Sequence, residues 1–193
     1  MGIILKEETS YEPIPSGMYD AVCTDIIDLG VQHSNGQYGE RDDLKVMLCW
    51  ELPELTDADG KPRVVRKTYT QSFSPKANIR KDLESWRGIP FTAEELEGFD
   101  LDAILGCGCQ IQIMQEKADN GKTYSNIKNI VPLKRDRWAE PTHKTSFVLA
   151  GDRLREIEFL PEFVQNIIRE SITYKQLAAE DLPFNDELPV EMK

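Results

Sequence analysis

Two segments of this chain place apolar residues at every second position, and each lies beside a hairpin signal. The odd-numbered residues from Cys107 to Ile113 and the even-numbered residues from Leu44 to Leu52 are all apolar. A period of two is the side-chain repeat of a β-strand. The Asp-Gly pair at 59–60 and the Asn-Gly pair at 120–121 are typical central residues of tight β-hairpins. The chain is therefore expected to build antiparallel hairpins.

The rest of the chain extends this pattern to five strands, rich in β-branched and aromatic residues. We expect strands over residues 18–30, 44–52, 63–73, 107–117 and 123–133.

Between the third and fourth of these strands the period changes to that of a helix. In residues 74–88, Ser74 can cap a helix, Pro75 suits a first turn and Gly88 ends it. A second, short helix should begin at Thr92, because Glu95 stands at capping-box distance.

Three strands, a helix and two further strands is the order of the oligonucleotide-binding (OB) fold. We therefore predict a mainly β protein: an OB-fold five-stranded Greek-key barrel, with a helix between strands 3 and 4 and a C-terminal helical appendage. The barrel domain should span residues 1–134, and a linker and C-terminal helix should span residues 135–175. Residues 176–193 are acidic, contain prolines and lack periodicity, so we expect a disordered tail there.

The charge distribution suggests a partner. The chain carries a net charge of −11, yet residues 61–87 hold eight basic and two acidic side chains, and residues 117–137 hold six and two. An acidic chain should not adhere indiscriminately to duplex DNA. A local groove of cations and flat rings is, however, what single-stranded nucleic acid requires.

These segments supply the candidate binding residues. Cations expected to neutralise phosphates are Arg41, Arg63, Arg66, Lys67, Lys76, Arg80 and Lys122. Rings expected to stack on bases are Tyr38, Tyr69, Phe73 and Tyr124. Two alternatives remain open: Tyr69 and Phe73 fit a barrel core equally well, and basic residues on an edge strand also prevent unwanted strand pairing.

The sequence offers no constellation of catalytic groups. It contains no phosphate-binding glycine loop and no nucleophile motif, and its two histidines, His33 and His143, are far apart. We therefore predict a protein that is not an enzyme, with no cofactor and no metal; a metal held by Cys107 and Cys109 would reopen the question. We expect the four cysteines to be buried, reduced thiols of a cytoplasmic protein. No apolar run is long enough for a membrane span.

The tail contains a short motif of its own. Residues 180–184, EDLPF, resemble the acidic-Pro-Phe tip with which bacterial single-stranded-DNA-binding proteins dock repair and replication enzymes. The resemblance implies that Asp181, Leu182, Pro183 and Phe184 bind replication or recombination proteins. The chain departs from that pattern because Phe184 is not its last residue.

Three longer stretches, residues 11–30, 60–101 and 120–133, resemble a family of OB-fold single-stranded-DNA-binding proteins encoded by bacteriophages and prophages. The resemblance covers residues 11–134 and, more weakly, the helix that begins at Leu160. It implies a phage origin and sequence-tolerant binding of single-stranded DNA during replication or recombination, in the host cytoplasm. It carries no residue-level roles.

One alternative of a different class remains. The chain could be an acidic protein-interaction module that mimics DNA, or an adaptor that acts on host replication or defence proteins through its tail. The sequence leaves the oligomeric state open, a homo-oligomer included.

Overall fold

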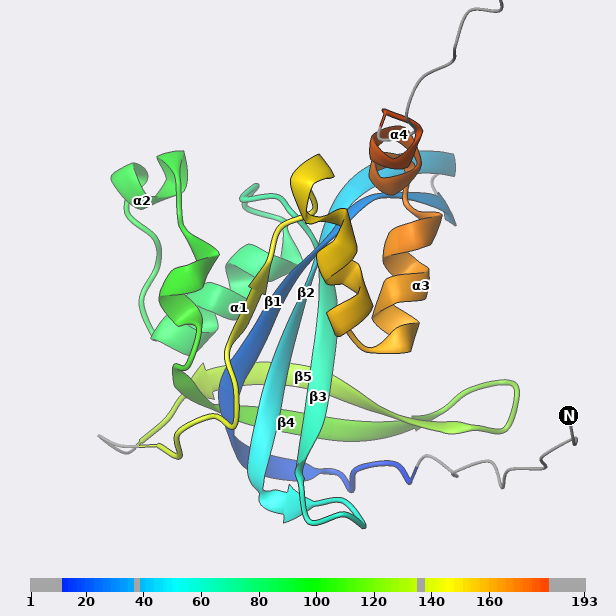
Figure 1. The fold of residues 1–193 in the computed structure, drawn as a ribbon. Helices are drawn as coiled ribbons and strands as arrows, with labels where there is room; N and C mark the ends of the chain where they lie inside the picture. Colours follow the sequence, from blue (N-terminus) through cyan, green and yellow to red (C-terminus); the bar gives the residue numbers. More distant parts are fainter. Residues whose placement is uncertain (1–11, 37–38, 135–137, 181–193) are drawn as a thin grey trace, which may run out of the picture.

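One six-stranded sheet organises the chain, with helical elements packed on both of its faces (Figure 1). The computed structural model describes residues 12–36, 39–134 and 138–180. The strands are β1 (Gly17–Gly36), β2 (Gly39–Thr56), β3 (Pro62–Thr70), β4 (Gly108–Lys117), β5 (Thr123–Pro132) and β6 (Thr145–Phe147). The helical elements are α1 (Asn78–Arg87), α2 (Ala93–Glu97), α3 (Glu162–Glu170), α4 (Ile172–Glu180) and the 3₁₀ helices η1 (Leu101–Ile104) and η2 (Gly151–Phe159).

The strand order is β3-β2-β1-β4-β5, with every neighbouring pair antiparallel. The short strand β6 pairs in parallel with β1, off this path. All five strands expected from the alternation are present, and α1 lies between the third and the fourth, as predicted.

The sheet does not close into the predicted barrel. Its end strands, β3 and β5, approach each other, but no ladder of hydrogen bonds joins them in the described chain. The structure is thus a mixed arrangement of an open, largely antiparallel sheet with helices. Alternation within a strand fixes which side chains face inward, but it does not specify whether the two end strands pair.

The helices after β3 follow their sequence signals except at the start of α1, where Ala77 is the N-cap and the predicted cap by Ser74 is wrong. Thr92 forms the expected capping box with Glu95 and starts α2. Helix α1 begins at Asn78, after a turn in which the Ala77 N–H donates to the Ser74 carbonyl. Its end is the expected one, because Gly88 adopts a φ of 73°, which glycine reaches at no steric cost.

The inner face of the sheet builds the larger of two apolar cores. Leu48, Trp50 and Ile111 are almost fully buried there, and Leu83 and Trp86 of α1 pack onto them. The alternation seen in the sequence therefore does define this inward face.

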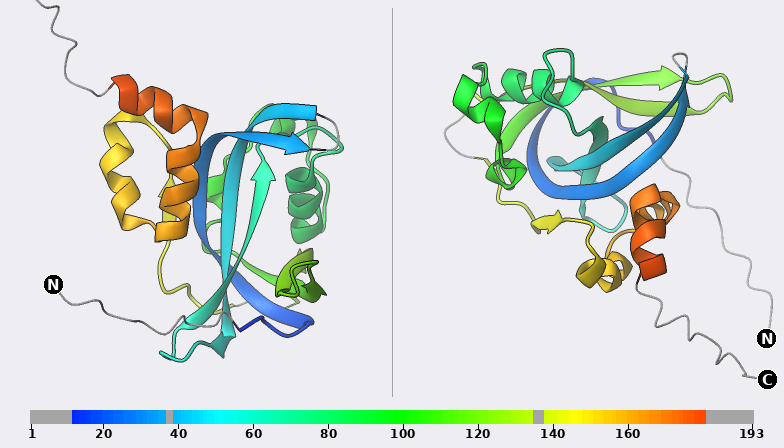
Figure 2. Two further views of the ribbon diagram at one scale, coloured as in Figure 1. Left: turned by 90° about the vertical axis from the view of Figure 1, so that its right-hand side faces the viewer. Right: turned by 90° about the horizontal axis from the view of Figure 1, so that it is seen from above.

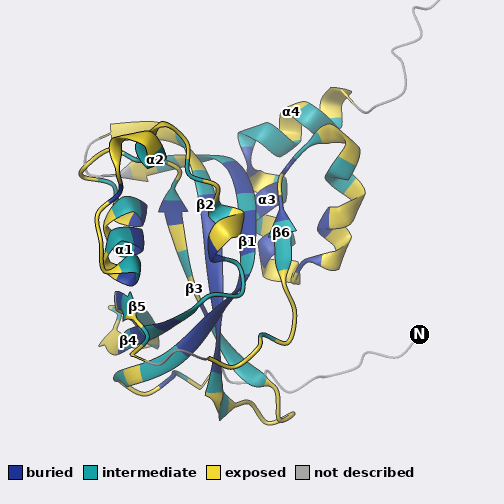
Figure 3. Ribbon diagram, turned by 90° about the vertical axis from the view of Figure 1, so that its left-hand side faces the viewer, coloured by how far each residue is buried: buried dark blue, intermediate teal, exposed yellow. Residues whose placement is uncertain are grey.

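The outer face of β1 and β2 builds a second core. Ile27 and Met47 point away from the first core and meet Ile157, Val164 and Ile168 of the C-terminal segment. Strands β1 and β2 are therefore buried on both faces, between α1 on one side and α3 on the other (Figures 2 and 3).

A glycine allows the C-terminal helices to approach β1. Gly30 lies at a bulge in the β1–β2 pairing and has a φ of 70°. A Cβ atom there would lie 2.9 Å from atoms of both Leu149 and Ser171. Directly after it, the Val31 N–H donates to Thr173 Oγ1 at 2.9 Å, which ties β1 to the start of α4.

The C-terminal segment contains more regular structure than expected. Residues 176–180, assigned above to the tail, are the last residues of α4. The remainder of the predicted tail lies outside the described residues. No helix in the described part of the chain is both long and apolar enough to cross a membrane.

Candidate nucleic-acid interface

The predicted binding residues of β3 divide between the two faces of the sheet. Alternation along the strand places Lys67 and Tyr69 on the inner face and Arg66 on the outer face. The inner pair meets α1, where Asp82 accepts from Lys67 Nζ at 2.6 Å and from the Tyr69 hydroxyl at 2.8 Å.

Tyr69 is a core residue. Its side chain is only 3% exposed. Burial raises the pKa of its hydroxyl above the ordinary value of 10, and the Asp82 carboxylate raises this pKa as well. The prediction that Tyr69 stacks on bases therefore does not fit this structure. The alternative, that Tyr69 belongs to the apolar core, does fit. The ammonium of Lys67 is likewise committed to Asp82.

Phe73 and Arg80 are also taken up by internal contacts. Phe73 packs against Phe91, with ring centroids 5.1 Å apart. Arg80 donates to Glu84 Oε1 at 3.0 Å and to the Phe73 carbonyl at 3.2 Å. Arg63 donates to the Glu12 carbonyl.

The remaining predicted cations and rings are exposed but dispersed. Arg41 lies on the β1–β2 hairpin, Lys122 and Tyr124 belong to the β4–β5 hairpin, and Lys76 precedes α1. In Figure 1 the β1–β2 hairpin ends near α4, whereas the β4–β5 hairpin ends well below it. The predicted residues thus do not form one continuous furrow.

Five predicted site residues cannot be placed. Tyr38 and the predicted partner-binding residues Asp181, Leu182, Pro183 and Phe184 lie outside the described residues.

The structure brings a different set of groups together on the outer face of the sheet. Thr145 of β6, Asp25 of β1, Cys49 of β2 and Arg66 of β3 are successive cross-strand neighbours. Above this row, the segment from His143 to Val164 encloses a cavity of about 390 Å³. Its apolar walls are Ile27, Val64, Phe147, Leu160, Phe163 and Val164.

Cations and aromatic rings surround the mouth of this cavity. The Arg66 guanidinium carbon lies 4.3 Å from the centroid of the Phe163 ring, within the range of a cation–π contact. Phe159 also lines the mouth and is 89% exposed. Arg153 pairs with Glu156, its Nη2 lying 2.6 Å from Oε2.

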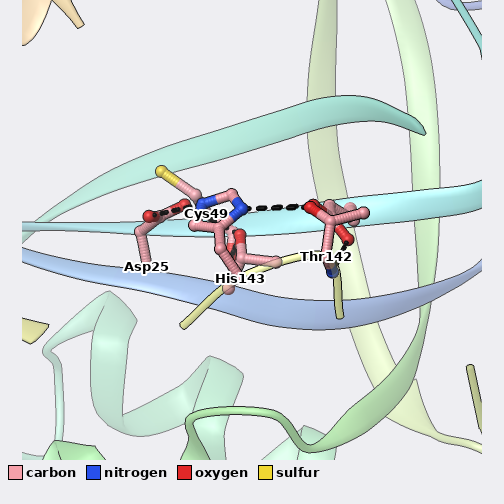
Figure 4. Close-up of polar contacts among 6 residues, drawn as sticks. Asp25, Cys49, Thr142 and His143 are labelled. Atoms are coloured by element: carbon pink, nitrogen blue, oxygen red, sulfur yellow. Dashed lines mark hydrogen bonds and ion pairs between the residues drawn. The ribbon is translucent and has the colours of Figure 1, made fainter. Parts of the chain in front are cut away.

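One side of the cavity is polar, and His143 connects its polar groups (Figure 4). The ring lies between two carboxylates: its Nε2 is 3.0 Å from Asp25 Oδ1, and its Nδ1 is 3.5 Å from Glu51 Oε1. Glu51 is 3% exposed and accepts from both the backbone N–H, at 2.9 Å, and the hydroxyl of Thr142. Thr142 and His143 thus fasten the approach to β6 onto the sheet.

Hydrogen bonds join the polar groups of this cluster to one another. Burial and, to a lesser extent, the nearby Asp25 carboxylate together raise the pKa of the Cys49 thiol to about 12, so the thiolate is scarce near neutral pH. The Thr142 hydroxyl donates to Glu51, and its oxygen lies 3.1 Å from His143 Nδ1. No group of three or more His, Cys, Asp or Glu side chains within the described ranges is arranged to hold a metal.

Sequence reasoning missed Phe159, Phe163, Arg153 and His143. Residues 151–164 contain two basic and four acidic side chains, so no basic patch marks them. Phe163 follows the apolar periodicity of α3, and that periodicity gives no indication that its ring is 38% exposed.

Comparison with models of protein families found no match, and comparison with curated proteins found none either.

Proposed function

We propose that this protein binds single-stranded DNA with little sequence preference and serves phage DNA replication or recombination. The binding surface we propose is the mouth of the outer-face cavity, formed by Arg66, Arg153, Phe159 and Phe163. It is not the furrow that the sequence suggested, from which only Arg66 is retained.

The single observation that carries this proposal is an exposed phenyl ring beside a stacked arginine and phenylalanine pair. Phe159 is almost fully exposed, and an apolar ring in that position lacks a packing role. Arg66 makes no ion pair with any described residue, so its charge is available. Flat rings that stack on bases, together with cations that meet phosphates, are the usual means of binding single strands.

The topology supports the same surface. The strand order and the position of α1 agree with an OB-like fold, although the β3–β5 pairing that closes such a barrel is missing. OB folds bind oligonucleotides on the face of strands 2 and 3. In this chain Arg66 lies on the outer side of β3, next to β2.

A fluorescence titration of labelled oligo-dT with the full chain tests the proposal. Phe159→Ala should weaken binding about 5- to 150-fold, because one stacked base contributes ~1–3 kcal/mol. Tyr124→Ala is the matched control: that ring is also exposed, at 43%, but lies on the β4–β5 hairpin, so its loss should leave affinity unchanged.

The same titration at several salt concentrations tests the role of charge. Arg66→Ala should reduce the salt slope by ~0.7, the contribution of one phosphate contact. Lys81→Ala, which removes an exposed charge from α1, should leave the slope as it is. Absence of oligonucleotide binding by the intact chain would contradict the proposal and favour the acidic adaptor instead.

A further inference from the structure

We propose that the outer-face cavity accepts one unstacked nucleobase, and that it prefers a base carrying an exocyclic amino group, cytosine above all. This inference rests on the proposed function and extends it: the mouth would hold the strand, and the cavity would read one base of it.

The size and the walls of the cavity suit a small flat ligand. A volume of about 390 Å³ is near the lower end of the range for small-molecule pockets. Val64 and Ile27 of the sheet pack together with Leu160 and Val164 of the C-terminal segment, and the four side chains form one apolar wall of the cavity. A planar ring in the cavity would lie with one face against this apolar wall, as extruded bases lie against apolar side chains in the proteins that bind them.

The polar groups of the cavity differ in what they can offer a base. The Asp25 side chain is 14% exposed and lines the cavity. Its carboxylate can only accept hydrogen bonds. An amino group, such as N4 of cytosine, donates to a carboxylate, whereas the carbonyl oxygen at the same position of uracil or thymine is repelled by it.

On the other side of Cys49 in the cross-strand row, Arg66 offers hydrogen-bond donors. Arg66 and Asp25 flank Cys49 on neighbouring strands, so two strand spacings, about 10 Å of sheet, separate them. A base lying over Cys49 can present its amino group to Asp25 and a carbonyl oxygen to Arg66. Cytosine has both groups at opposite ends of its pairing edge.

The charges near the cavity argue against a bare anion as the ligand. Asp25 and Glu156 line the cavity together with its two arginines, and Glu156 already pairs with Arg153. A phosphate on the Asp25 side of the cavity would meet the Asp25 carboxylate, and the buried Glu51 carboxylate lies 3.5 Å from the neighbouring His143 ring. Phosphate therefore belongs at the mouth, beside Arg66, and the base belongs inside.

The test compares short oligo-dC with oligo-dU, which lacks the amino group and differs in nothing but the pairing edge. The wild-type chain should bind oligo-dC at least about fivefold more tightly, as expected for one discriminating base contact. Asp25→Asn should abolish the difference, because a carboxamide can both donate and accept. Equal affinity of the wild-type chain for the two oligonucleotides would overturn the inference and leave the proposed function standing.

A cavity-filling pair of variants locates the effect. Val64→Phe should occupy the cavity and remove the preference for oligo-dC, while Val148→Phe, at a position 55% exposed and outside the cavity lining, should keep it. Thermal unfolding shows whether each variant is folded. A folded Val64→Phe protein that retains the full preference would contradict the inference.

Free nucleotides separate a strand from a small molecule as the source of the base. Titration with dCMP and with dUMP, followed by NMR chemical shifts, should show shifts around the cavity for dCMP alone. If dCMP binds there while oligonucleotides do not, the cavity assignment holds and the DNA-binding proposal fails. If neither dCMP nor the oligonucleotides bind, the cavity assignment and the DNA-binding proposal are both wrong.

Discussion

Individual side chains show how burial determines chemistry in this protein. Desolvation raises the pKa of the Cys23, Cys49 and Cys109 thiols, to about 12 for Cys49. These three side chains are buried, whereas Cys107 is partly exposed. Position inside or outside the two cores should therefore control which thiol reacts.

Thiol labelling checks this expectation. At pH 8, a maleimide should modify Cys107 well before the other three cysteines, because the thiolate is the reactive form and the buried thiols are protonated and shielded. In denaturant all four should react at similar rates. Mass spectrometry of peptides after brief labelling measures the extent of reaction at each cysteine. Labelling of Cys23 or Cys49 as fast as that of Cys107 in the folded chain would contradict the expectation.

At the scale of elements, α1 and α2 are held together by charged hydrogen bonds. Arg87 Nη2 donates to Glu95 Oε1 at 2.6 Å, and the Thr92 N–H donates to Glu95 Oε2 at 2.8 Å. These bonds stabilise the ionised carboxylate, so they lower the pKa of Glu95 below its ordinary value of 4.5. The guanidinium of Arg87 also lies over the Phe91 ring, 4.4 Å from its centroid.

This arrangement predicts a loss of stability in acid. Because the pKa of Glu95 is lower in the folded chain, its contribution is complete above pH 4.5 and disappears as the pH falls through the folded-state value. Glu95→Gln should therefore lower the melting temperature at pH 7. By pH 3 the melting temperatures of the variant and the wild type should lie closer together. Calorimetry across this range measures it; a difference that stays constant with pH would refute the assignment.

At the scale of the whole molecule, two apolar cores share strands β1 and β2. The described chain beyond residue 134 does not form a core of its own. Instead, the outer face of β1 and β2 is covered by β6, η2 and α3. The C-terminal segment is thus packed onto the sheet, and both cores should unfold together.

Ile168 tests this cooperativity, because it is completely buried in the second core. Ile168→Ala should cost about 2–5 kcal/mol of unfolding free energy. The loss should appear in the fluorescence of Trp50 and Trp86, which lie in the first core. Ile89→Ala, at a position 57% exposed, is the control. If Ile168→Ala does not change the urea midpoint of the unfolding transition seen by tryptophan fluorescence, the two cores unfold independently.

The sequence by itself determined the local features: the five strands, the two hairpin turns, the Thr92 capping box and the place of α1. Each depends on residues a few positions apart, so periodicity and turn chemistry suffice to predict it. Only the tertiary structure decided that Tyr69 is buried, that Arg66 faces away from Lys67, and that the sheet stays open. The physical reason is that charges and rings distant in sequence meet only where packing brings their elements together, and composition carries no record of which face a neighbouring helix will cover.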